Sequence, residues 1–207
     1  MKKVILFFAL FAMCLGVKAQ WEEVEIHGIN YPSYFNDICF CNTNIGYVVG
    51  AHNSNSFIYR GIVLKTTDGG ENWETIYVHY DIDIQSVSFQ SPDTGYVCGY
   101  HGKIPQTADS TYSMVLKTID GGATWLPFLT SSQIDPSTFI QVRFFNENNG
   151  VIISNKGTYY TTNGGVSWNF LQGILGSVGM LNENVGMIGK HLFHFEETDL
   201  IIDEEIA

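Results

Sequence analysis

The sequence is poor in positive charge. Only 10 of its 207 residues are lysine or arginine, against 21 aspartates and glutamates, and the formal net charge at pH 7 is −11. Proteins that bind nucleic acid neutralise its phosphates with clustered lysines and arginines, and this chain has few of either. We therefore expect no nucleic acid among its partners.

The signatures of common catalytic and cofactor sites are also missing. The sequence contains no nucleophile elbow, no HExxH zinc motif, no P-loop and no dinucleotide fingerprint. It shows no helical periodicity and, after residue 19, no apolar run near the roughly 18 residues that span a bilayer. We expect no cofactor, no metal site and no membrane span after that point. Hydrophobic residues nevertheless make up 45% of the chain, which indicates a folded core.

The N-terminus has the pattern of an export signal. Lys2 and Lys3 precede an apolar run from Val4 to Val17, and Ala19 completes a Val-x-Ala cleavage site. This run is too short to cross a bilayer, so residues 1–19 predict a signal peptide rather than a membrane anchor. The mature protein would begin at Gln20 and be secreted, periplasmic or displayed at the cell surface.

Three cysteines follow the predicted signal peptide: Cys39, Cys41 and Cys98. Because three is an odd number, at most one disulfide can form within the chain. Cys39 and Cys41 are two residues apart in an expected strand, where their side chains share a face. That arrangement is compatible with a disulfide or a metal site, but no third soft ligand lies at motif spacing, which favours small buried side chains.

Internal repeats dominate the rest of the sequence. Three segments align without gaps on the pattern Thr-x-Asp/Asn-x-Gly-x-x-Trp, and each predicts a hairpin turn. The acidic or amide side chain bonds to nearby backbone amides, the glycines take positive φ, and the tryptophan covers the turn. We expect these residues to be structural: Thr66, Asp68, Gly70, Trp73; Thr118, Asp120, Gly122, Trp125; Thr161, Asn163, Gly165, Trp168.

A second signature precedes each turn. An Ile/Val-x-Phe run is followed by glycine six residues after the phenylalanine, as in Phe40 and Gly46, Phe89 and Gly95, or Phe144 and Gly150. A fourth copy, with Met180 and Gly186, keeps the spacing but has no turn segment after it. Apolar residues in these runs alternate with period 2, so they predict strands.

Each repeat therefore predicts four strands, the unit of a β-propeller blade. Blades are expected at about 37–79, 84–130, 139–172 and 176–195, the last with three strands. The segment Trp21 to His27 resembles a fourth strand without a blade, and it could close the ring by joining blade 4. The alternative is an open arc of a larger propeller. Residues 20–195 would form the propeller domain, and the acidic segment 196–207 would be a solvated tail.

The turn segments resemble Asp-box (BNR) repeats of sialidase-like propellers. Together with the Phe-x-x-x-x-x-Gly-Tyr-x-x-Gly signature, they most resemble the photosystem II assembly and stability factor family and its secreted bacterial relatives, over about Trp21 to Phe195. Asn163 departs from the usual aspartate. The resemblance implies a β-propeller that acts as a non-enzymatic binding or assembly factor.

Two enzymatic functions of such propellers require residues that the sequence lacks or already uses in the turn segments. A sialidase grips its substrate carboxylate with three guanidinium groups, whereas this chain has only Arg60 and Arg143. A glycosidase needs two carboxylates across one sugar bond, and the tempting pair, Asp68 and Asp120, already has a turn role. A glycan-binding or glycan-cleaving protein remains the alternative to a protein-binding propeller.

The expected recognition surface lies opposite the turn segments. In a four-stranded meander the loops between the second and third strands lie at the other end of the blade from the turns. In blades 1 and 2 these loops are longest, at about 51–59 and 100–113. Exposed aromatic side chains on such loops are usual recognition elements. The candidate binding residues are His52, Tyr59, Tyr100, His101 and Tyr112.

Overall fold

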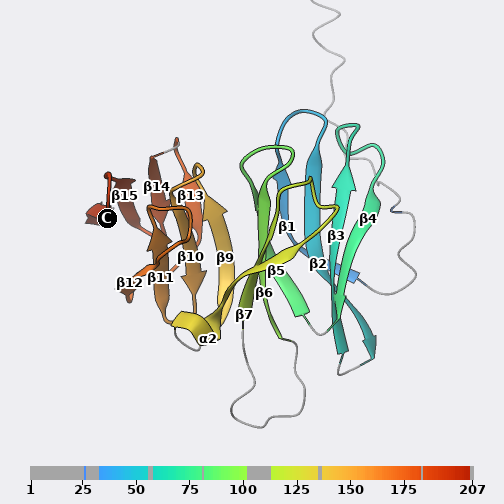
Figure 1. Cartoon of the computed structure of the whole chain (residues 1–207), viewed down its shortest axis with the longest axis horizontal. Helices are drawn as coiled ribbons and strands as arrows, with labels where there is room; N and C mark the ends of the chain where they lie inside the picture. Colours follow the sequence, from blue (N-terminus) through green and yellow to red (C-terminus); the bar gives the residue numbers. More distant parts are fainter. Residues whose placement is uncertain are drawn as a thin grey trace, which may run out of the picture.

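The structure is a computed structural model, and it describes residues 26, 33–55, 58–80, 82–101, 113–134, 137–182 and 184–205. This part of the chain forms four antiparallel sheets of four strands each, which are the blades of a β-propeller (Figure 1). The predicted all-β fold is confirmed. None of the helices in the described part is long and apolar enough to cross a membrane.

The strands of each blade follow one another in chain order. Blade 1 contains β1 (Ser33–Phe40), β2 (Gly46–Asn55), β3 (Ile58–Thr66) and β4 (Glu74–Tyr80). Blade 2 contains β5 (Ile82–Phe89), β6 (Gly95–His101), β7 (Ser113–Thr118) and β8 (Leu126–Thr130). The short helix α2 (Ser131–Ile134) connects it to blade 3.

Blade 3 contains β9 (Phe139–Phe144), β10 (Gly150–Ser154), β11 (Gly157–Thr161) and β12 (Asn169–Gln172). Blade 4 contains β13 (Val178–Met180), β14 (Val185–Ile188), β15 (His191–Phe195) and β16 (Leu200–Glu205). Strand β16 corrects the sequence prediction, in which residues 196–207 formed a solvated tail. Leu200 is buried and Ile202 packs on the same apolar cluster, which pins this acidic segment to β15. Trp21, the expected source of that strand, lies outside the described residues.

The spacing between phenylalanine and glycine has a steric cause. Phe40, Phe89 and Phe144 each lie directly across the ladder from the glycine six residues later. Each ring covers its glycine, and a Cβ added at Gly95 would lie 2.5 Å from the Phe89 ring. Only glycine leaves room for the ring at this position.

The second glycine of the signature permits a close backbone approach. At Gly50 and Gly99 the register between the first two strands of the blade shifts by one residue. A Cβ at Gly50 would lie 2.0 Å from the Tyr34 carbonyl oxygen, and one at Gly99 would lie 2.2 Å from that of Asp83. The pattern Gly-Tyr-x-x-Gly therefore encodes a bulge in blades 1 and 2.

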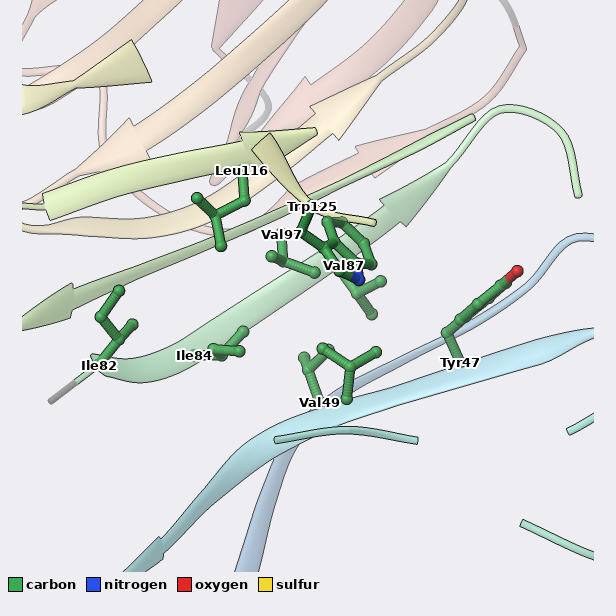
Figure 2. Close-up of a cluster of buried hydrophobic side chains, with 9 residues drawn as sticks. Tyr47, Val49, Ile82, Ile84, Val87, Val97, Leu116 and Trp125 are labelled. Carbon is green, nitrogen blue, oxygen red and sulfur yellow. The ribbon is translucent and has the colours of Figure 1, made fainter. Parts of the chain in front are cut away.

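The core lies between the blades. One buried cluster joins blade 1 to blade 2, a second joins blade 2 to blade 3, and a third joins blade 3 to blade 4. Figure 2 shows the first, in which Tyr47 and Val49 of β2 face Ile84 and Val87 of β5. Tyr47 stacks on Phe89 with ring centroids 3.6 Å apart, and Tyr96 stacks on Phe144 at 3.9 Å. The first two of the three apolar interfaces thus carry the same stacked aromatic contact.

The four blades form an open arc. Among the described residues, no fourth buried cluster joins blade 4 back to blade 1. In Figure 1 blade 4 lies beside blade 3 at one end of the long axis and blade 1 lies at the other end, with blade 2 between them. The described residues are therefore arranged as the arc, while the segment Trp21 to His27, which was expected to close the ring, lies almost entirely outside them.

Candidate functional site

The Thr-x-Asp/Asn-x-Gly-x-x-Trp segments form three equivalent turns, here called the box turns (66–73, 118–125 and 161–168). In the first, the Thr66 hydroxyl donates to Asp68 Oδ1 at 2.7 Å, and Thr66 Oγ1 accepts from the Gly70 amide at 2.9 Å. Asp68 also accepts from the backbone and side-chain amides of Asn72. Both glycines, Gly69 and Gly70, have positive φ. The carboxylate therefore closes the turn.

Hydrogen bonding holds the box carboxylates ionised. Bonds from Asn72 lower the pKa of Asp68 to about 2, and bonds from Thr124 do the same for Asp120. In the third turn Asn163 makes the corresponding bonds, accepting from Thr161 at 2.9 Å and from the Ser167 amide at 3.0 Å. Since an uncharged amide serves equally well, the geometry needs an acceptor oxygen rather than an acid. The box turns have the structural geometry expected from the sequence.

A charged network lies where the first strands of the blades converge, on the propeller axis. Arg143 of β9 forms an ion pair with Asp37 of β1, with Nη2 3.0 Å from Oδ2. Arg143 Nη1 also donates to the Ser86 hydroxyl at 2.8 Å and to the Val87 carbonyl at 2.7 Å, both on β5. One guanidinium therefore connects blades 1, 2 and 3.

This network borders an open polar pocket of about 260 Å³. Its lining comes from the first strands of blades 1 to 3 and from Ser177, just before β13. Asp37 Oδ2 already accepts from the Ser86 hydroxyl at 2.8 Å and from the Val87 amide at 3.0 Å. These bonds, with those from Arg143, commit this carboxylate to holding the blades together.

A buried carboxylate, Asp83, lies at the end of the blades opposite the box turns. Tyr34 donates to Asp83 Oδ2 at 2.7 Å, and Asn36 Nδ2 donates to Oδ1 at 3.2 Å. Burial raises the pKa of Asp83, while hydrogen bonds from these two residues, Gln85 and Tyr100 oppose the shift. The two tyrosine rings are thus held by one buried acid between blades 1 and 2.

Four of the five candidate binding residues lie in strands rather than on the expected loops. His52 lies in β2, which extends to Asn55, and it is 7% exposed rather than displayed on a loop. Burial lowers its pKa, and the nearby Arg60 lowers it further. The alternation of β2 continues past Gly50, which turns His52 inward.

Tyr100 lies in β6 rather than on a loop and is half-buried beside Asp83. Tyr59 and His101 lie in β3 and β6, and their side chains are outside the described part. Tyr112 is also outside the described residues. The structure therefore joins Tyr100 to Tyr34 and Asp83, two residues that the sequence did not single out.

The cysteines are free thiols in the described part of the chain. Burial raises the pKa of Cys39, and it raises that of Cys41 to about 11. Cys98 is buried in the cluster between blades 2 and 3, and burial raises its pKa strongly. Within the described residues no group of three or more histidine, cysteine or acidic side chains is placed to hold a metal ion.

Comparisons with known proteins agree with this architecture. A sequence model of the family described as "Photosynthesis system II assembly factor YCF48" matches residues 15–184. The structure is similar to that of YCF48 from Cyanidioschyzon merolae, with a TM-score of 0.52 and 20% identity over 89% of this chain and 59% of that one. It is also similar to the GH74 xyloglucanase from Xanthomonas campestris, with a TM-score of 0.50 and 12% identity over 80% and 27% of the two chains.

No curated protein matches the chain. This chain spans less than two thirds of the length of either structural relative, and both likenesses concern the fold. The family match covers most of the sequence. It includes all three box turns, the strands of blades 1 to 3, and β13 of blade 4. The chain belongs to the photosystem II assembly factor YCF48 family of propeller proteins.

Proposed function

We propose that this protein is an exported, non-enzymatic propeller that binds a protein partner in the manner of an assembly factor. Its binding surface would be the end of blades 1 and 2 opposite the box turns. Family membership supports an assembly-factor-like role, and the tyrosine cluster on Asp83 supports the location.

The tyrosine cluster, Tyr34 and Tyr100 on Asp83, is the observation that carries the proposal. Tyr34 is 38% exposed although its hydroxyl is fixed to a buried carboxylate. A ring held in place offers large amphipathic contact area, and it loses little conformational entropy when a partner binds. Because Tyr34 lies in β1 and Tyr100 in β6, the rings stand on the rigid sheets of two different blades.

The described acids near the axis favour binding over catalysis. Glycoside hydrolysis needs one carboxylate to protonate the leaving group and another to attack or activate water. Asp37 is committed to Arg143 and Ser86, whereas Asp83 is buried under four donors. Asp68 and Asp120 close turns in different blades. Each of these acids has a structural partner set of its own.

The test is affinity purification of partners from the native cells, followed by binding measurements with the purified partner. The double variant Tyr34→Ala with Tyr100→Ala should weaken binding by at least about tenfold, the scale of losing aromatic anchors. Glu71→Ala, an exposed change on a box turn, is the control for the opposite face and should bind normally. If Glu71→Ala lost binding while the double variant bound normally, the binding surface would lie at the box-turn end, and the proposed location would be wrong.

A glycan-binding or glycan-cleaving role is the second candidate. The likeness to a GH74 xyloglucanase suggests it, and so does an open depression of about 820 Å³ between blades 3 and 4. Asparagines and glutamates of the two blades line this depression, and such groups hydrogen-bond sugar hydroxyls. Hydrolysis of xyloglucan by the purified protein would contradict the proposal of a non-enzymatic propeller and support the glycan-cleaving role. Absence of both xyloglucan turnover and xyloglucan binding, together with a specific protein partner, would exclude it.

Export rests on the N-terminal pattern alone. N-terminal sequencing of the protein recovered from its native cells should begin at Gln20. A sequence that begins at Met1 would contradict the proposed signal peptide.

A further inference from the structure

The three interfaces between blades share one set of parts. The first strand of the later blade presents a valine to the earlier blade, at Val87, Val142 and Val178, and all three are buried in the clusters. The residue after the phenylalanine in the earlier blade faces the later one, as Cys41 and Phe145 do. Each blade thus has a front face and a back face that complement each other.

A hydrogen bond on the axis repeats with the apolar contact. The amide of each buried valine donates to a side chain of the preceding blade. The donor and acceptor are Val87 and Asp37 at 3.0 Å, Val142 and Ser86 at 3.3 Å, and Val178 and Gln141 at 2.7 Å. The interface is therefore specified by polar register as well as by apolar shape.

The front face of blade 1 carries the same parts uncovered. Ile38 corresponds to Val87, and Phe35 corresponds to Ile84 by its pairing with the second glycine. Ile38 is 56% exposed and Phe35 is 44% exposed, whereas Val87 and Ile84 are buried. Phe40, the counterpart of Phe89, is also exposed, since among the described residues no tyrosine stacks on it as Tyr47 stacks on Phe89. An apolar strand of this kind on a free sheet face marks an interaction site.

The back face of blade 4 carries the complementary parts. Leu181 occupies the position of Phe145 and is 64% exposed. Met187 follows Gly186 as Tyr47 follows Gly46, so its thioether stands where a ring would stack. Ser177 immediately precedes Val178, as the acceptors Ser86 and Gln141 precede Val87 and Val142, and it is exposed.

We propose that two copies of this chain associate head to tail, the β1 face of each copy packing on the blade 4 face of the other. The structure itself indicates a second copy as the partner. The exposed front face of blade 1 and the exposed back face of blade 4 are the two halves of an interface that the structure already forms three times. Propellers have about four to eight blades. Two arcs of the four described blades would give an eight-bladed ring, which lies within that range.

The test compares oligomeric state by sedimentation velocity at about 50 µM protein, well above the dissociation constant of a standard-sized interface. The wild type should sediment as a dimer. Ile38→Glu on β1 and Leu181→Glu on blade 4 should each give monomers, because a charge then lies inside both copies of the junction. Ile119→Glu is the matched control, since Ile119 is 70% exposed on a box turn and should leave the dimer intact.

Mixing the two monomeric variants gives the sharpest result. Each variant retains one intact face, so the mixture should form a heterodimer through a single junction, whereas neither variant does so alone. Unchanged melting curves would show that both variants fold. A monomeric wild type would overturn the proposal. So would a Leu181→Glu variant that stays dimeric, which would indicate contact between two β1 faces.

Discussion

The axial ion pair offers the strongest single test of how the arc is held together. Arg143 reaches across blade 2 to Asp37, and the two residues are 106 positions apart in the chain. Replacing Arg143 by methionine keeps most of the side-chain length but removes the charge and every donor. It leaves Asp37 without its counterion and the carbonyl of Val87 without this bond.

The size of the effect follows from burial and remaining bonds. Breaking a buried ion pair by removing one partner costs about 3–5 kcal/mol of unfolding free energy. Arg143 and Asp37 side chains keep 19% and 18% exposure, and Asp37 still accepts from Ser86 and Val87. We therefore expect the low end, about 3 kcal/mol for Arg143→Met and about 2 kcal/mol for Asp37→Ala.

Urea unfolding measures this directly. With a slope of about 2–3 kcal/mol per molar urea for a chain of this size, Arg143→Met should lower the midpoint by about 1 M. The double variant should lose less than the sum of the single losses, with a coupling of about 1–2 kcal/mol. Arg143→Lys should fall between, because lysine keeps the charge but not the planar array of donors. Additive single effects, within about 0.5 kcal/mol, would refute the reasoning.

Two further predictions concern the repeated signatures. Gly99→Ala should destabilise the protein by at least about 2 kcal/mol, because the added Cβ would lie 2.2 Å from the Asp83 carbonyl oxygen, whereas Gly179→Ala, with nothing within 4 Å, should melt like the wild type. The folded-state pKa values of Asp68 and Asp120 are about 2, below the ordinary value of 3.8, so their contribution to stability is present above pH 4 and is lost as the pH falls toward 2. Asp68→Asn with Asp120→Asn should flatten the loss of unfolding free energy over that range, and an unchanged acid profile would contradict the assigned turn role.

The sequence predicted those features that depend on neighbours along the chain. The box turns are encoded within eight residues, and the phenylalanine and glycine pair sits across a single hairpin. Such contacts impose fixed spacings that recur within one sequence. Blades 1 to 3 were therefore expected within a few residues of their observed bounds.

Features made by contacts between blades were not visible in the sequence. Nothing in the sequence around Arg143 indicates that Asp37 lies opposite it. Asp83 and Tyr34 were missed for the same reason, since they meet across blades. The prediction of a tail in place of β16 was wrong. The three apolar residues Leu200 to Ile202 stand between acidic residues on both sides, and the acidic composition of the segment favours a solvated tail.

In the described part of the chain, four blades form an open arc with two uncovered faces. Spin labels at equivalent loop positions test it, at Asn44 in blade 1, Asp93 in blade 2 and Asn184 in blade 4, in a chain whose cysteines are replaced by serine. Labelled protein is diluted into excess unlabelled protein, so that only distances within one chain are measured. We predict that the distance between labels at 44 and 184 is much longer than that between 44 and 93. In a closed four-bladed ring blade 1 would neighbour blade 4 as it neighbours blade 2, and two equal distances would contradict the arc.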